Sequence, residues 1–254
     1  MLHSTRGIVF NSVKYSETSV IVKIYTELFG IQSYIFKGIH RAGSKIKPAL
    51  FQPLTLLDLE VSHREKQSIQ HAREIHLAQP YQSIPFDIRK SSLALFINEL
   101  VYKTIREEEA NPALFEFLWT SCRELDTTAI PVSAFHLFFA LHFCHYLGIF
   151  PLANYSEELP WFNLREGQFQ ATVPGHPHYL EPGKGKLFNA MLAECNREED
   201  ENGGPATWRN SEIFATLRAE TRNELLETIL LYYRLHLPGF MGLQSHHILH
   251  DVLA

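Results

Sequence analysis

The sequence has few cysteines and no long hydrophobic run. Cys122, Cys144 and Cys195 are an odd number at wide spacing, which excludes a disulfide framework and favours a reducing compartment. No apolar stretch approaches the roughly 20 residues that span a bilayer, and the first residues lack the apolar segment of a secretion signal. We therefore expect a cytoplasmic protein that does not bind membranes.

Acidic residues are absent between Glu27 and Asp58. The first 80 residues hold ten Lys and Arg against six Asp and Glu, whereas the remaining 174 hold thirteen against twenty-two. Because the whole chain has a net charge of −5, any nucleic-acid site must be local to the first part. Cations beside aromatic rings can bind the phosphates and bases of a single strand. The acid-free segment has four cations: Lys37, Arg41, Lys45 and Lys47.

Alternation of apolar and polar residues predicts five short strands in this first part. A long basic connection, from Gly38 to Gln52, separates the third strand from the fourth. Five strands with one extended loop are typical of a small closed barrel of the OB type, and an SH3-like barrel fits the count almost as well. The predicted strands are Gly7–Val13, Val20–Tyr25, Ile31–Lys37, Pro53–Val61 and Ile69–Leu77.

After Pro80 the apolar residues recur with a helical period. Asn111 followed by Pro112 predicts an N-cap and the first turn of a helix. The segment Leu225–Tyr233 is apolar almost all round, which is typical of a buried helix. Gly and Pro residues within Trp161–Tyr179 predict a β-hairpin. The predicted fold class is α+β, with an OB-fold barrel in residues 1–80 and a mostly helical domain in 81–254 that includes a hairpin at about 160–180.

Five segments match the motifs of one known family in their order along the chain: Gly7–Phe10, Tyr15–Thr18, Ile24–Gly30, Phe36–Arg41 and Tyr232–Phe240. Taken together, these motifs resemble those of RecO recombination mediators. The resemblance implies an N-terminal OB-fold followed by a helical domain. It also implies binding to single-stranded DNA, annealing of complementary strands, association with the nucleoid during repair and, with RecR, loading of RecA onto strands coated by the single-strand-binding protein.

The resemblance further implies that the acidic, apolar C-terminal tail of the single-strand-binding protein docks on the helical domain. Many RecO proteins also carry a four-cysteine zinc ribbon about where Trp161–Tyr179 lies. This stretch has no cysteine, and His176 and His178 supply two of the roughly four ligands a structural zinc needs. We therefore expect no metal and no cofactor. Cations that could border the tail site are Arg89, Lys90, Lys103, Arg106 and Arg123.

Residues expected to contact DNA lie on the second and third strands and in the loop after them. Lys23 and Tyr25 point away from Val22 and Ile24, so one of these two pairs faces outward. Tyr34 and Phe36 share a face and can belong to the barrel core or stack on bases. The predicted DNA-binding residues are Lys23, Tyr25, Lys37, Arg41, Lys45 and Lys47.

The sequence contains few residues in arrangements that indicate catalysis. His246, His247 and His250 lack the intervening Glu of a zinc-protease motif, so we interpret them as surface or capping histidines. No cysteine adjoins an evident His-plus-carboxylate arrangement. We expect a protein that is not an enzyme. The main alternative to DNA binding is an adaptor whose barrel binds acidic peptides.

Overall fold

The computed structural model describes residues 2–39, 46–64, 66–105, 109–196 and 211–253. The chain divides into two compact units, Met1–Thr127 and Thr128–Ala254. The change from strands to helices falls close to the predicted residue 80, but the units divide later because the first two helices pack with the strands. Each unit is described by itself.

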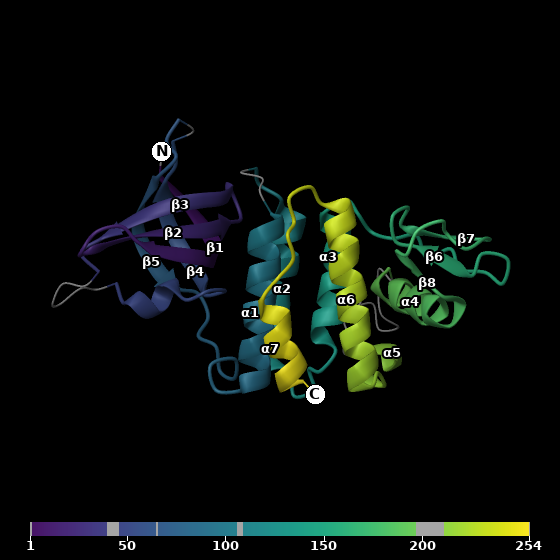
Figure 1. Ribbon diagram of the computed structural model, residues 1–254. Helices are drawn as coiled ribbons and strands as arrows, with labels where there is room; N and C mark the ends of the chain where they lie inside the picture. Colours follow the sequence, from purple (N-terminus) through teal and green to yellow (C-terminus); the bar gives the residue numbers. More distant parts are fainter. Residues whose placement is uncertain (1, 40–45, 65, 106–108, 197–210, 254) are drawn as a thin grey trace. The chain divides into compact units, whose positions relative to one another are not determined.

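The first unit begins with a closed five-stranded barrel (Figure 1). The strand order is β1-β2-β3-β5-β4, with β1 antiparallel to β2 and β4, and a short parallel pairing of β3 with β5. The predicted OB-fold barrel is confirmed. Its elements are β1 (Leu2–Lys14), β2 (Ser19–Thr26), β3 (Gly30–Lys37), the 3₁₀ turn η1 (Pro48–Phe51), β4 (Leu56–Ser62) and β5 (Gln70–Leu77).

The barrel interior is filled by one face of each strand. Val22 and Ile24 of β2 are fully buried there, and so is Tyr34 of β3. Phe36 packs against Phe51 of η1 with ring centroids 4.7 Å apart. Because successive side chains of a strand alternate between faces, the intervening residues of β2 and β3 form the outer surface.

Helices α1 (Ile88–Thr104) and α2 (Pro112–Thr127) complete the first unit. The predicted N-cap of α2 is confirmed, since the backbone N–H of Leu114 donates to Asn111 Oδ1 at 3.0 Å. Asn98 of α1 donates from Nδ2 to the carbonyl oxygen of Phe10 in β1, at 3.1 Å. This bond fixes α1 against the barrel.

The segment between β5 and α1 is held by Asp126, near the end of α2. Its buried carboxylate accepts hydrogen bonds from the backbone N–H groups of Gln82, Ser83 and Ile84, at 2.8–3.0 Å. Burial opposes ionisation, but these donors together hold the pKa of Asp126 below its usual range. The connection between barrel and helices is therefore fixed rather than a free linker.

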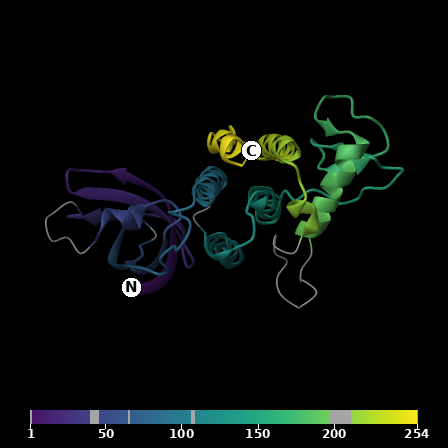
Figure 2. The ribbon, with the colours of Figure 1, turned by 90° about the horizontal axis from the view of Figure 1, so that it is seen from below.

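The second unit consists of helices and a small sheet of order β7-β6-β8. Tyr233 of the buried helix α6 donates to the carbonyl oxygen of Ala140 in α3, at 2.7 Å. Figure 2 shows α6 nearly end-on, while α4 runs across the view. The predicted hairpin is present, with a third short strand beside it. The elements are α3 (Phe135–Tyr146), β6 (Trp161–Asn163), β7 (Gln168–Gln170), β8 (Tyr179–Leu180), α4 (Pro182–Cys195), α5 (Glu212–Ala215), α6 (Ala219–His236) and α7 (Ser245–Val252).

Candidate nucleic-acid interface

The predicted cations that the structure describes lie on the outer face of β2 and in the segments after β3. Lys37 ends β3 and is exposed, and so is Lys47, which precedes η1. Neither forms an ion pair within the described part of the chain, so both charges are open to a ligand. Arg41 and Lys45 lie outside the described residues.

Lys23 is half-buried on the outer face of β2, opposite Ser33 of β3. Its Nζ lies 5.3 Å from the ring centroid of Tyr102 in α1, a cation–π distance. Asn11 Nδ2 in turn donates to the Tyr102 hydroxyl at 3.4 Å. The lysine is thus positioned by an aromatic ring while part of it remains accessible.

Tyr25 does not lie on the surface. It is 1% exposed, and its ring stacks on Phe10 at a centroid distance of 5.6 Å and packs against Phe115 of α2 at 6.0 Å. The expectation that Tyr25 contacts DNA is therefore wrong for this structure. Tyr25 lies on the face of β2 opposite Val22 and Ile24, outside the barrel core, but α2 covers that part of the outer face.

Tyr34 and Phe36 belong to the barrel core. They are 0% and 3% exposed, and burial raises the pKa of the Tyr34 hydroxyl. Neither ring can stack on a base without opening the barrel, which settles the alternative that the sequence left open.

An apolar row between the cations was not expected from the sequence. Val13 of β1 faces Ile21 of β2, which faces Ile35 of β3, which in turn faces His71 of β5. Val13 is 58% exposed, His71 is exposed and the two isoleucines are half-buried. The sequence did contain a signal for this row: Ile21 and Ile35 share the outer face of the second and third predicted strands with Lys23. A strand face that is open to solvent is usually polar, so isoleucines there are unusual. The row places partly exposed apolar side chains beside Lys23 and Lys37.

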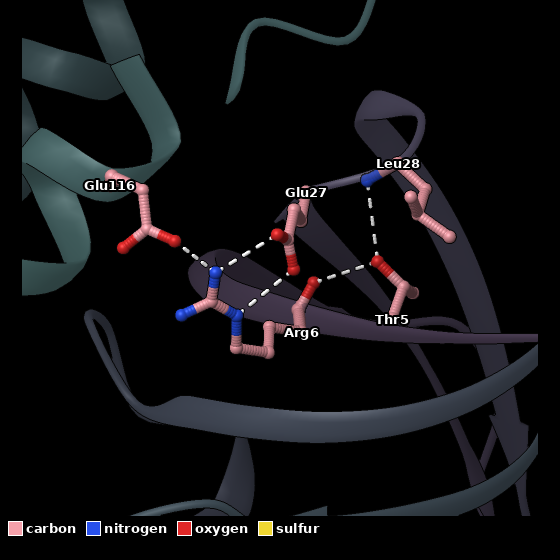
Figure 3. Close-up of polar contacts among 5 residues, drawn as sticks. All are labelled: Thr5, Arg6, Glu27, Leu28 and Glu116. Carbon is pink, nitrogen blue, oxygen red and sulfur yellow. Dashed lines mark hydrogen bonds and ion pairs between the residues drawn. The ribbon is translucent and has the colours of Figure 1, made fainter. Parts of the chain in front are cut away.

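Arg6 of β1 fixes α2 over the other end of this face (Figure 3). Its Nε and Nη2 each donate to a carboxylate oxygen of Glu27 at 2.9 Å, and Nη2 also bonds Glu116 of α2. The guanidinium lies 5.1 Å from the ring centroid of Phe115 and 5.0 Å from that of Trp119. The hydrogen bonds from Arg6 hold the pKa of Glu27 below its usual range, although burial acts in the opposite direction.

The described residues offer little to a metal or to a nucleophilic mechanism. No group of three or more His, Cys, Asp or Glu among them could hold a metal ion. Burial raises the pKa of Cys122 and of Cys144 to about 12, so neither thiol is an activated nucleophile. Across these same residues, no helix combines the length and apolarity needed to cross a bilayer.

Comparison with known proteins matches both parts of the chain to one family. Residues 1–81 match the model described as Recombination protein O N terminal, and residues 85–156 match Recombination protein O C terminal. The curated DNA repair protein RecO of Bacteroides fragilis is 34% identical over 254 residues, 99% of each chain. Those of Phocaeicola vulgatus and Flavobacterium psychrophilum are each 33% identical, covering 100% and 98% of both chains.

Proposed function

Because the chain belongs to the RecO family of DNA repair proteins, whose role is in repair and recombination, we propose that it acts as a recombination mediator on single-stranded DNA. In this proposal the protein binds single strands on the outer face of its barrel and promotes annealing of complementary strands. With RecR, it supports loading of RecA onto strands coated by the single-strand-binding protein.

The observation that carries the proposal is whole-length similarity to RecO proteins combined with an open cationic face on the OB barrel. OB barrels bind oligonucleotides on the face of strands 2 and 3 and their flanking loops. Here that face carries Lys23 and Lys37, with Lys47 in the segment that follows β3. Arg41 and Lys45, from the same segment in sequence, would add two cations.

The chemistry of this face favours contacts that do not depend on sequence. Lysines bind phosphates without reading bases, and the aliphatic side chains of Ile21 and Ile35 accept any base against them. Contacts of this kind leave the hydrogen-bonding edges of the bases available, which annealing to a second strand requires. Since pairing supplies the free energy of annealing, the protein needs no catalytic group, and we propose that it acts passively.

An annealing assay tests this function. The protein should accelerate pairing of two complementary labelled strands, and the double variant Lys37→Glu, Lys47→Glu should lose most of that acceleration. Arg165→Glu, Arg234→Glu makes the same charge change at two exposed residues of the second unit and should anneal normally. Equal loss in both double variants would indicate a general charge effect and refute this interface.

We also propose a docking site for the acidic tail of the single-strand-binding protein at the start of α1. Of the candidate cations, Lys90 is buried and donates to Ser83 Oγ at 2.7 Å, and Lys103 pairs with Glu99 at 2.7 Å. Arg106 lies outside the described residues, while Arg89 and Arg123 are exposed.

Arg89 has the apolar neighbours that such a tail requires. Phe86 is 85% exposed and Ile88 is 68% exposed, so two large apolar side chains and a cation lie within four residues. An apolar anchor bordered by a positive charge suits a peptide that combines acidic and apolar residues.

The tail peptide should bind the full-length protein, and a scrambled peptide of equal charge should bind at least tenfold more weakly. Phe86→Ser should weaken tail binding without unfolding the protein, because the ring is already in water. Met241→Ser is the matched control, since Met241 is 89% exposed. Unchanged tail binding by Phe86→Ser would place the site elsewhere.

A further inference from the structure

Three aromatic rings meet at the end of the barrel opposite Lys37. Phe29, in the turn between β2 and β3, stacks on His63, which follows β4, with centroids 4.1 Å apart and ring planes 11° apart. His3 of β1 meets Phe29 edge-on at 5.2 Å. All three rings are half-buried, so they are partly open to solvent at this end.

The loops that carry the two stacked rings are held by hydrogen bonds. The backbone N–H of Phe29 donates to Thr26 Oγ1 at 3.2 Å, and Gln32 Nε2 donates to the carbonyl oxygen of Phe29 at 2.9 Å. Gln70, which is 1% exposed, holds the other loop: its Nε2 donates to the Arg64 carbonyl oxygen at 2.8 Å, and its Oε1 accepts from the Arg64 N–H at 2.9 Å. Preorganised loops lose less conformational entropy when a ligand binds.

Cations flank the ring pair. Arg64 and Lys66 come directly after His63 and are exposed, and neither forms an ion pair with a described residue. With Glu65 between them in sequence, the loop tip carries a net charge of +1. A ring pair beside cations meets the two requirements of single-strand binding, a platform for a base and charges for phosphates.

Packing alone does not explain the imidazole at residue 63. Its Nδ1 is buried and has no hydrogen-bond partner among the described residues, and an unpaired buried polar atom costs free energy. A phenylalanine would stack on Phe29 without this cost. The histidine is therefore suboptimal for stability alone, as residues at binding sites often are.

We propose that Phe29 and His63 form a base-stacking subsite for single-stranded DNA, with Arg64 and Lys66 contacting the adjacent phosphates. The subsite rests on the proposed DNA-binding function and extends it to the far end of the barrel. Since β3 has eight residues at about 3.3 Å each, the ring pair and Lys37 are separated by about 25 Å. One strand of several nucleotides can reach both, within the range of about 4 to 16 nucleotides per OB-fold.

The test uses full-length protein and a mixed-sequence strand of about 12 nucleotides. His63→Ala should weaken binding about fivefold or more, the effect of losing one base–aromatic stack. Because the cations assigned to the phosphates, Arg64 and Lys66, are unchanged, the slope of log affinity against log salt should stay the same. His63→Phe keeps the stack and should bind within about twofold of wild type. The exposed His76 provides the control, and His76→Ala should bind like wild type.

A second measurement locates the base. One abasic nucleotide is placed at each position of the strand in turn, which removes the ring but keeps the phosphate. Wild type should lose affinity at a defined position, and His63→Ala should show no further loss there. If wild type binds DNA and His63→Ala binds it with the same affinity, the subsite alone is overturned. If wild type does not bind single-stranded DNA, the proposed function itself is overturned. A loss of affinity by His63→Phe as large as that of His63→Ala would show that stacking is not the cause.

Discussion

Arg6 should contribute more to stability than other arginines on the barrel. Arg6→Ala removes a two-bond ion pair with Glu27 and two cation–π contacts, with Phe115 and Trp119. It also removes the bond to the exposed Glu116, which adds little. The ion-pair side chains are each 31% exposed, so solvent screening keeps that contribution below about 1 kcal/mol. Each cation–π contact adds about 0.5–1 kcal/mol. The expected loss is about 2 kcal/mol, or about 6 °C in the melting temperature of a unit of this size.

Thermal unfolding at pH 7 of full-length Arg6→Ala, with Arg73→Ala as the control, measures this loss. Arg73 is 68% exposed and its ion pair with Glu60 is 3.9 Å long, so its removal should change the melting temperature little. Because the pKa of Glu27 is lowered in the folded protein, the ion-pair part is present above the ordinary Glu pKa of about 4.3 and is lost as pH falls through the folded pKa. Equal melting of the two variants at pH 7 would refute the role given to Arg6.

Three further predictions concern the second unit. Burial, with smaller contributions from nearby positive groups, lowers the pKa of His136 to about 3. Below about pH 6.5 the unfolded chain therefore binds a proton at His136 that the folded protein does not bind. The free energy of unfolding should consequently fall by up to about 1.4 kcal/mol for each pH unit towards acid. Denaturant titrations between pH 7 and 5 should show a shallower fall in His136→Leu, and an unchanged fall would contradict this. Gly167 has φ of +67°, and a Cβ there would lie 2.7 Å from the Tyr232 hydroxyl, so Gly167→Ala should lower the free energy of unfolding by about 2 kcal/mol or more. Gly148 has a similar φ but no atom near the position of a Cβ, so Gly148→Ala should lower it less. Equal losses of stability in the two variants would show that the clash with Tyr232 is not the cause. Elemental analysis should find no stoichiometric zinc, since the β6–β7 hairpin region has no cysteine, whereas one zinc per chain released only on unfolding would refute this.

The strands and helices were predictable because their signals are local. The alternation in Val20–Tyr25 and the capping pair Asn111–Pro112 each specify an element from a few neighbouring residues. The same alternation showed that Lys23 and Tyr25 share a face. It could not show that a helix 90 residues later covers one of them, because that depends on contacts distant in sequence.

Considering all the apolar residues of α2 together would have indicated the burial of Tyr25. Phe115 and Trp119 lie beside the apolar stripe of Leu114 and Leu118, so the apolar face of the helix is broad. A face this broad has room for two packing partners, and one of them is the barrel. The burial of Lys90 could not be predicted from neighbouring residues either, because its hydrogen-bond partner Asp126 is 36 residues away in sequence.

The central claim is that the barrel binds single-stranded DNA through its cations. The most direct measurement is a titration of the full-length protein with mixed-sequence single-stranded DNA at several salt concentrations, with an acidic peptide as competitor. If about four phosphates are neutralised, log affinity should fall against log salt with a slope of about −3. The variant Arg41→Glu, Lys45→Glu, Lys47→Glu should bind far more weakly and show a shallower slope. Affinity that does not change with salt, or preferential binding of the acidic peptide, would contradict the account and favour an adaptor instead.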